Sequence, residues 1–120
     1  MKKEYEKALN DFSKALNVDP TFVETYNDMA WILATCPDEA YRNGEKAIRL
    51  AQKAMELRPN MRMYWLDTLA AGYAEIGDFE QAVNIQEEAI ALLQTEFAPA
   101  AIFPYMQRLE QYRQHNPWRD

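Results

Sequence analysis

The sequence predicts an all-α protein, a solenoid of antiparallel helix pairs closed by a C-terminal capping helix. Three observations support this fold class. Glycine is scarce, with 3 in 120 residues, which disfavours a sheet of short strands joined by tight turns. Hydrophobic residues make up 48% of the chain, and alanines recur among them at helical spacing. Most directly, one short pattern occurs three times along the chain, as expected for a repeat architecture.

The repeated pattern is an acidic residue, a polar or basic residue, an alanine and an aliphatic residue, with a second alanine seven residues after the first. Positions seven apart lie on one helical face, so each copy predicts a helix whose small residues let a neighbour approach closely. Pro20 and Pro59 then end the first two copies. The copies are Glu6-Lys7-Ala8-Leu9 with Ala15, Glu45-Lys46-Ala47-Ile48 with Ala54, and Glu80-Gln81-Ala82-Val83 with Ala89.

Partner helices are expected before the second and third copies. Residues 26–34 align position by position with residues 66–74, with large, small and large apolar residues in the same order. The connection over residues 36–44 is long and predicts a loop with one short turn. In the next repeat the connection is tight, because Gly77 is suited to end one helix and Asp78 to cap the next.

These elements divide a single domain, residues 1–120, into four segments. Residues 3–20 predict a second helix without its partner. Residues 21–59 form a repeat with the long loop, residues 60–94 form a tighter repeat, and residues 95–120 form a linker and the capping helix. Pro104 suits the first turn of that last helix. An apolar stripe is expected to face the core at Tyr105, Met106, Leu109 and Tyr112, with Gln107, Arg108, Glu110, Gln111, Arg113 and Gln114 facing water.

The pattern over residues 3–94 resembles the tetratricopeptide repeat (TPR), with its paired alanines, its closing prolines, and Gly77 and Phe79 at the turn. Tyr26 and Leu66 stand where the family pattern has tryptophan. Residues 30–38 and 42–47 are similar to a bacterial variant of the repeat, which often ends a longer array. The resemblance implies a right-handed solenoid, a scaffold for protein–protein interaction without catalysis, and a concave groove lined by the first helices.

The groove implied by the resemblance is acidic and contains two aromatic residues. Aromatic rings bury a large area and attract cations, so the expected ligand is a peptide or protein segment with Lys or Arg beside an apolar residue. The alternative is that Trp31 belongs to the core and the acids are solvated. The groove residues are Glu24, Asn27, Asp28, Trp31, Tyr64, Asp67, Thr68, Ala71 and Glu75.

Many TPR domains bind the C-terminal acid of a chaperone through a carboxylate clamp of Lys, Asn and Arg. This sequence departs from that pattern, because Trp31 and Ala71 cannot supply the asparagine. Glu24, Tyr64 and Thr68 stand where the clamp needs polar or basic groups, and an acidic groove repels a carboxylate. Chaperone-tail binding is therefore not expected.

The unpaired first helix suggests a second, structural function. Without a partner helix, the side bearing Ala8, Leu9, Phe12 and Leu16 is expected to be partly uncovered, and exposed apolar area tends to mark an interface. Missing upstream repeats, self-association into a homo-oligomer, or simple tolerance would each account for it. Leu9, Phe12 and Leu16 are the candidate self-association residues.

Charge and composition argue against other partners. With 13 Lys and Arg against 19 Asp and Glu, the net charge is −6 and no basic run offsets it. Nucleic acid and anionic membranes are therefore not expected as partners on electrostatic grounds. Three features favour a cytoplasmic setting. The chain has no long apolar stretch, its N-terminus becomes acidic within a few residues, and Cys36 is its single cysteine.

No constellation in the sequence predicts an enzyme, a metal or a cofactor. Cys36 and His115 are the sole thiol and imidazole, and a nucleophile pair would need them adjacent although one lies in a loop and the other after the last helix. A zinc site needs several Cys or His ligands. There is also no glycine-rich phosphate loop.

Overall fold

The structure is a computed structural model that describes residues 2–120, with side chains from residue 4 onward. Over this range it contains helices and no strand, which confirms the predicted all-α class. The helices are α1 (Lys2–Val18), α2 (Val23–Thr35), α3 (Gly44–Leu57), α4 (Arg62–Glu75), α5 (Phe79–Leu93) and α6 (Pro99–Arg113), with 3-10 turns η1 (Glu39–Tyr41) and η2 (Pro59–Met61).

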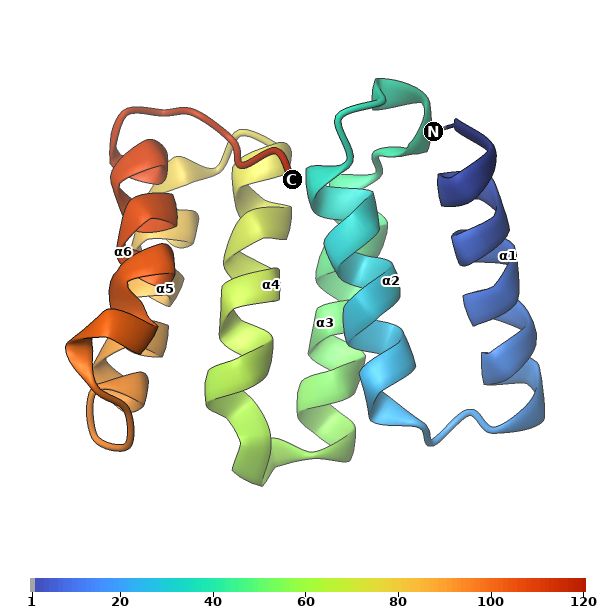
Figure 1. The fold of residues 1–120 in the computed structure, drawn as a ribbon, viewed down its shortest axis with the longest axis horizontal. Helices are drawn as coiled ribbons and strands as arrows, with labels where there is room; N and C mark the ends of the chain where they lie inside the picture. Colours follow the sequence, from blue (N-terminus) through green and yellow to red (C-terminus); the bar gives the residue numbers. More distant parts are fainter. Residues whose placement is uncertain (1) are drawn as a thin grey trace.

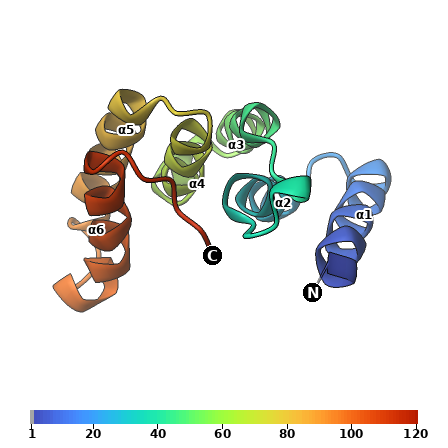
Figure 2. The ribbon, with the colours of Figure 1, turned by 90° about the horizontal axis from the view of Figure 1, so that it is seen from above.

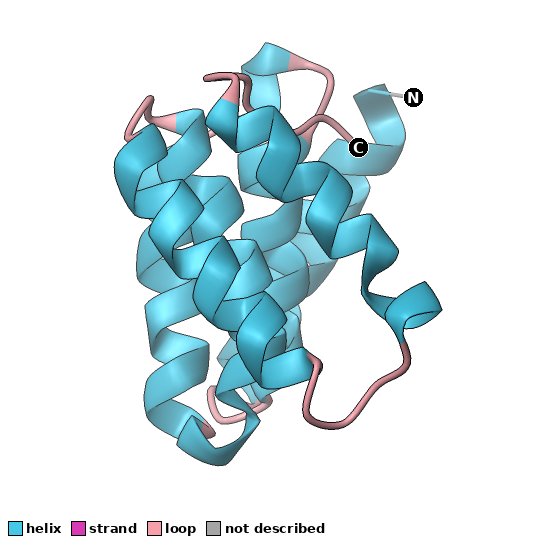
Figure 3. Cartoon of the chain, turned by 90° about the vertical axis from the view of Figure 1, so that its left-hand side faces the viewer, coloured by secondary structure: helices cyan, strands magenta, loops and turns pink. Residues whose placement is uncertain are grey.

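The helices pack in chain order, each against its sequence neighbours, and α2 also packs against α4. Figure 1 shows α2, α4 and α6 side by side, with α3 and α5 behind them. Seen from above, the row bends so that the C-terminal segment lies on the side of α2, α4 and α6 (Figure 2). The connecting loops lie at the two ends of the helices (Figure 3).

The paired alanines of α3 and α5 are fully buried positions of the core. Ala47 and Ala54 in α3, and Ala82 and Ala89 in α5, are all 0% exposed. Each pair faces the helix before it, as the seven-residue spacing predicts, because a methyl group is the largest side chain that a close helix crossing accommodates. Ala15, the equivalent residue of α1, is exposed, and no described helix covers it.

Helix α1 is nonetheless attached to the core through its apolar side. Leu9, Phe12 and Leu16 are half-buried and pack against the cluster formed mainly by α2, α3 and α4. The residues expected to serve self-association therefore already have an intramolecular contact. Ala15 is exposed and Val18 is 87% exposed, so the uncovered part of α1 lies beside the predicted residues.

The tight turn between α4 and α5 follows the prediction. Gly77 has a φ of 86°, a left-handed conformation in which glycine avoids the strain of a Cβ atom. The Gly77 and Asp78 N–H groups donate to the carbonyls of Ala74 and Tyr73, which ends α4 with a Schellman motif. The Asp78 carboxylate accepts from the Gln81 N–H at 3.2 Å and caps α5.

Helices α3 and α4 cross closely where two glycines meet. A Cβ atom on Gly72 would lie 2.9 Å from Ile48 Cγ1, and one on Gly44 would lie 2.7 Å from Ile76 Cγ2. Both distances are shorter than ordinary van der Waals contact, so neither position has room for a side chain at this crossing. The crossing brings the end of α4 next to the loop before α3, where Arg42 pairs with Glu75.

The last helix begins earlier than predicted. It starts at Pro99, and Pro104 lies inside it instead of in its first turn. Pro99 suits the first helical position equally well, and the extra turn buries Ile102, 2% exposed, against Ile90 and Leu93. That burial offsets the hydrogen bond that Pro104 cannot donate. Met106 is 50% exposed and so does not join the predicted apolar stripe.

The chain turns sharply after α6. His115 has a φ of 63°, and the His115 and Asn116 N–H groups donate to the carbonyls of Tyr112 and Gln111 in a second Schellman motif. The His115 ring stacks on Phe79 with centroids 5.2 Å apart. Among the helices described, none has the length and apolar character needed to cross a membrane.

Candidate functional site

The main concavity lies where α1, α2, α4 and α6 converge, and its volume is about 470 Å³. Six residues around it were expected to line a concave groove: Asn27, Asp28, Trp31, Tyr64, Asp67 and Thr68. Three others, Phe12, Ile32 and Tyr105, complete its wall. We call this concavity the acidic pocket.

The three additional residues were missed for different reasons. Phe12 was expected to serve self-association, and only the packing of α1 on α2 turns it towards the pocket. Tyr105 was expected to face the core of the cap, but it is half-buried at the pocket wall. Ile32 follows Trp31 on α2, and its helical position alone did not distinguish it from a core residue.

The remaining three predicted residues lie outside the acidic pocket. Glu24 is exposed near the start of α2. Ala71 is 1% exposed and belongs to the core, so it cannot contact a ligand as expected. Glu75 lies at the end of α4, where its carboxylate pairs with Arg42 and Arg119. The pocket is therefore shorter than the predicted groove.

Asp67 forms the pocket floor, where it is paired inside the protein. Arg108 Nε donates to Asp67 Oδ1 at 2.9 Å, and Gln86 Nε2 donates to the same oxygen at 2.8 Å. The side chains of Arg108 and Asp67 are each 12% exposed. Arg108 was expected to face water, and this is wrong because the buried carboxylate on α4 draws it inward.

Aromatic rings surround the Arg108 guanidinium. Its central carbon lies 4.7 Å from the Tyr105 ring centroid, 5.5 Å from that of Trp31 and 5.8 Å from that of Trp118. These distances suit cation–π attraction. Because α2, α6 and the C-terminal segment each contribute one ring, Arg108 joins three parts of the chain at the pocket edge.

The acid of the pocket that makes no ion pair in the structure is Asp28. Its partial burial, and secondly the nearby Glu24 carboxylate, raise the pKa of Asp28 above the ordinary value of 3.8. Asn27 Oδ1 beside it is buried and accepts no hydrogen bond within the described chain. Among the described residues, the Asp28 carboxylate is therefore an acceptor at the pocket wall without an ion-pair partner.

A smaller apolar pocket of about 180 Å³ adjoins the acidic pocket. Tyr64 and Tyr105 line both, so one wall is shared. The other lining residues come from α5, α6 and the loop between them: Leu93, Phe97, Ala101 and Ile102. Phe97 is 39% exposed, which leaves apolar surface at the pocket mouth.

The residues weighed as a catalytic pair lie in different settings. Cys36 is 2% exposed at the end of α2, whereas His115 is exposed and stacks on Phe79. Across residues 4–120, no three His, Cys, Asp or Glu side chains are grouped so that they could hold a metal ion.

Comparison with protein-family models, curated proteins and solved structures finds no match to this chain.

The side chains that line the two pockets give the site its chemical character. It combines an acidic pocket with aromatic walls, an adjoining apolar pocket, and a C-terminal segment that crosses from α6 to the end of α2 (Figure 2). The arrangement places a carboxylate and aromatic rings beside an apolar surface.

Proposed function

We propose that this chain is a non-catalytic protein-interaction module, a TPR-like right-handed solenoid whose concave side binds a peptide or protein segment. The observation that carries the proposal is the convergence of six expected groove residues on one pocket of about 470 Å³. The buried alanine pairs of α3 and α5 support the repeat architecture, because two consecutive helix pairs use the same small residues at their crossing.

The acidic pocket suits a lysine or arginine of the ligand. The Asp28 carboxylate can accept hydrogen bonds from the ligand, and the Trp31 and Tyr64 rings supply faces for cation–π contact. Such contacts contribute roughly 0.5–2 kcal/mol each, depending on how far they are desolvated. The net charge of −6 favours the approach of a basic segment.

The adjoining apolar pocket suits an apolar side chain next to that basic residue. Leu93 and Ile102 form its base and Phe97 its rim. Full burial of a leucine-sized side chain contributes about 1.5–3 kcal/mol. Because Tyr64 and Tyr105 separate the two pockets, one ligand segment fills both only if the basic and apolar residues are close in its sequence.

Selection of peptides from a random display library tests the proposal. Enrichment of peptides that pair Lys or Arg with an apolar residue is expected on the wild-type chain, with loss on an Asp28→Lys variant. Glu56→Lys is the matched control, since it makes the same charge change on α3, outside both pockets. If selected peptides bind the Asp28→Lys and wild-type chains equally, the acidic pocket is not the binding site.

Self-association through α1 is the alternative function. The observation that favours it is the exposure of Ala15 at the position whose equivalents, Ala54 and Ala89, are fully buried by a partner helix. Sedimentation equilibrium of wild type and an Ala15→Glu variant decides it. A dimer that the charge disrupts supports the alternative, whereas a monomeric wild type at high concentration excludes it.

A further inference from the structure

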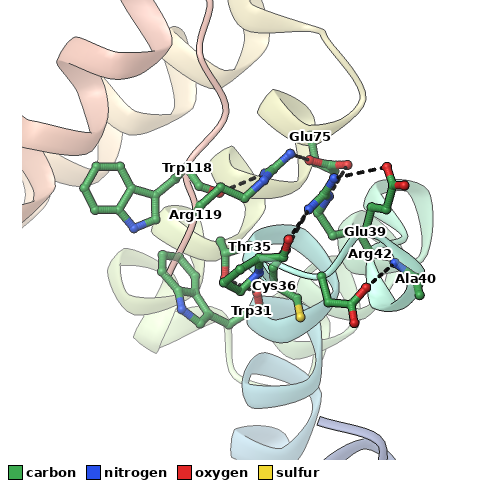
Figure 4. Close-up of polar contacts among 11 residues, drawn as sticks. Trp31, Thr35, Cys36, Glu39, Ala40, Arg42, Glu75, Trp118 and Arg119 are labelled. Carbon is green, nitrogen blue, oxygen red and sulfur yellow. Dashed lines mark hydrogen bonds and ion pairs between the residues drawn. The ribbon is translucent and has the colours of Figure 1, made fainter. Parts of the chain in front are cut away.

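The segment after α6 contacts the ends of α2 and α4 as a bound peptide would. The Asp120 N–H donates to the Thr35 carbonyl at 3.0 Å, and Trp31 Nε1 donates to Asp120 Oδ2 at 2.8 Å. Arg119 Nη2 lies 2.7 Å from Glu75 Oε1 in an ion pair. Figure 4 shows Trp118 beside Trp31, and Arg119 and Arg42 both directed at Glu75.

We propose that residues 117–120 are an intramolecular ligand, and that they occupy a subsite that binds an extended partner segment with an aromatic residue, an arginine and an acidic residue in succession. The subsite consists of the Thr35 carbonyl, the Trp31 indole N–H, the Glu75 carboxylate and the Arg108 guanidinium. This subsite differs from the two proposed pockets, and residues 117–120 of the chain itself occupy it in the structure.

The groups of this subsite exist without the segment. Thr35 is the last residue of α2, and the carbonyls of a final helical turn lack partners within the helix. Glu75 also accepts from Arg42 Nε at 3.2 Å, so departure of Arg119 leaves no unpaired buried charge. Arg108 keeps its pair with Asp67 and its contacts with Tyr105 and Trp31. An empty subsite therefore remains assembled.

The segment itself is held incompletely. Pro117, Trp118 and Arg119 are half-buried, and Asp120 is exposed. The buried Trp118 Nε1–H donates to no acceptor within the described chain, which weakens the docked state. The hinge is His115, a non-glycine residue in the left-handed region, where a side chain adds strain. A partner segment that leaves no such buried N–H unpaired would compete with the chain's own segment.

Displacement is governed by effective concentration. A short tether holds its ligand at an effective concentration of about 1 mM. If the segment and an external peptide both have an intrinsic dissociation constant of about 100 µM, the peptide would bind roughly tenfold more weakly while the segment is docked. Removal of the segment should restore that factor. A segment that is merely part of the fold predicts no binding of the external peptide in either form.

The experiment uses a fluorescein-labelled peptide with the sequence of residues 115–120, His-Asn-Pro-Trp-Arg-Asp, and fluorescence anisotropy. The probe should bind a chain ending at residue 114 at least tenfold more tightly than the whole chain. A peptide with glutamate in place of its arginine should not bind. Because Trp118 packs against the cluster around Tyr112, circular dichroism must first show that the shortened chain is folded.

A full-length Arg119→Glu variant keeps the proposal testable if the shortened chain unfolds. The new carboxylate faces Glu75 and should release the segment, so this variant should also bind the labelled peptide. If the variant is folded and binds no peptide, the segment is a fixed part of the fold and the proposal is overturned. Asp28→Lys in the opened chain should leave this binding unchanged, so failure of the acidic pocket and failure of the subsite are distinguishable.

Discussion

Replacement of Arg108 by methionine probes the link between α6 and the pocket floor. Methionine keeps an unbranched stem and removes the guanidinium whose Nε donates to Asp67 at 2.9 Å. In the variant, Asp67 would keep its bond from Gln86 but lose its counter-ion at a site where both side chains are 12% exposed. The three aromatic rings around Arg108 would also lose their cation.

We expect Arg108→Met to lower the free energy of unfolding by about 3–5 kcal/mol, the usual effect of removing one member of a buried ion pair. An unfolding entropy of about 2.1 cal/mol/K per residue, over 120 residues, converts this to a fall in Tm of roughly 12–20 °C. Thermal and urea unfolding followed by circular dichroism at neutral pH measure both quantities.

Arg113→Met is the matched control on the same helix. Arg113 lies 3.1 Å from Glu87, but these side chains are 51% and 50% exposed, so the loss should stay below about 1 kcal/mol. Combining Arg108→Met with Asp67→Asn should recover part of the stability, because no buried charge is then left unpaired. If Arg108→Met destabilises the chain no more than Arg113→Met, the pair is not desolvated and our description of the pocket floor is refuted.

Three further predictions concern turns, packing and charge. Gly77→Ala should destabilise by about 1–2 kcal/mol through backbone strain alone, since φ is 86° and nothing lies within 4 Å of the new Cβ atom; urea unfolding measures it. Gly72→Val should destabilise more in the same assay, because its Cβ would lie 2.9 Å from Ile48 Cγ1 and force α3 and α4 apart; an equal or smaller loss would contradict the close crossing. Asp28→Asn should stabilise the free chain at neutral pH. The pKa of Asp28 is raised on folding, so the wild type loses stability as pH rises through that pKa, and the two chains should converge below pH 3.8 in a series of pH-dependent melts.

The sequence by itself determined where most helices lie and which face of each repeated helix carries the small residues. In α3 and α5 the seven-residue alanine spacing predicted positions that are 0% exposed, because helical periodicity is a local property that two turns of chain already express. Gly77 and Asp78 were predictable for the same reason. Their roles depend on the backbone conformation of one or two residues and not on distant parts of the chain.

Tertiary structure alone decided what meets at the candidate site. Trp31 and Asp120 are 89 residues apart in sequence, and no local pattern predicts their hydrogen bond. The sequence around Arg108 is typical of a solvated helix face. In the structure Arg108 instead forms an ion pair with the buried Asp67 of α4. Periodicity describes one helix at a time, whereas a pocket depends on the angle and offset at which separate helices pack, and these follow from the summed contacts of the whole core.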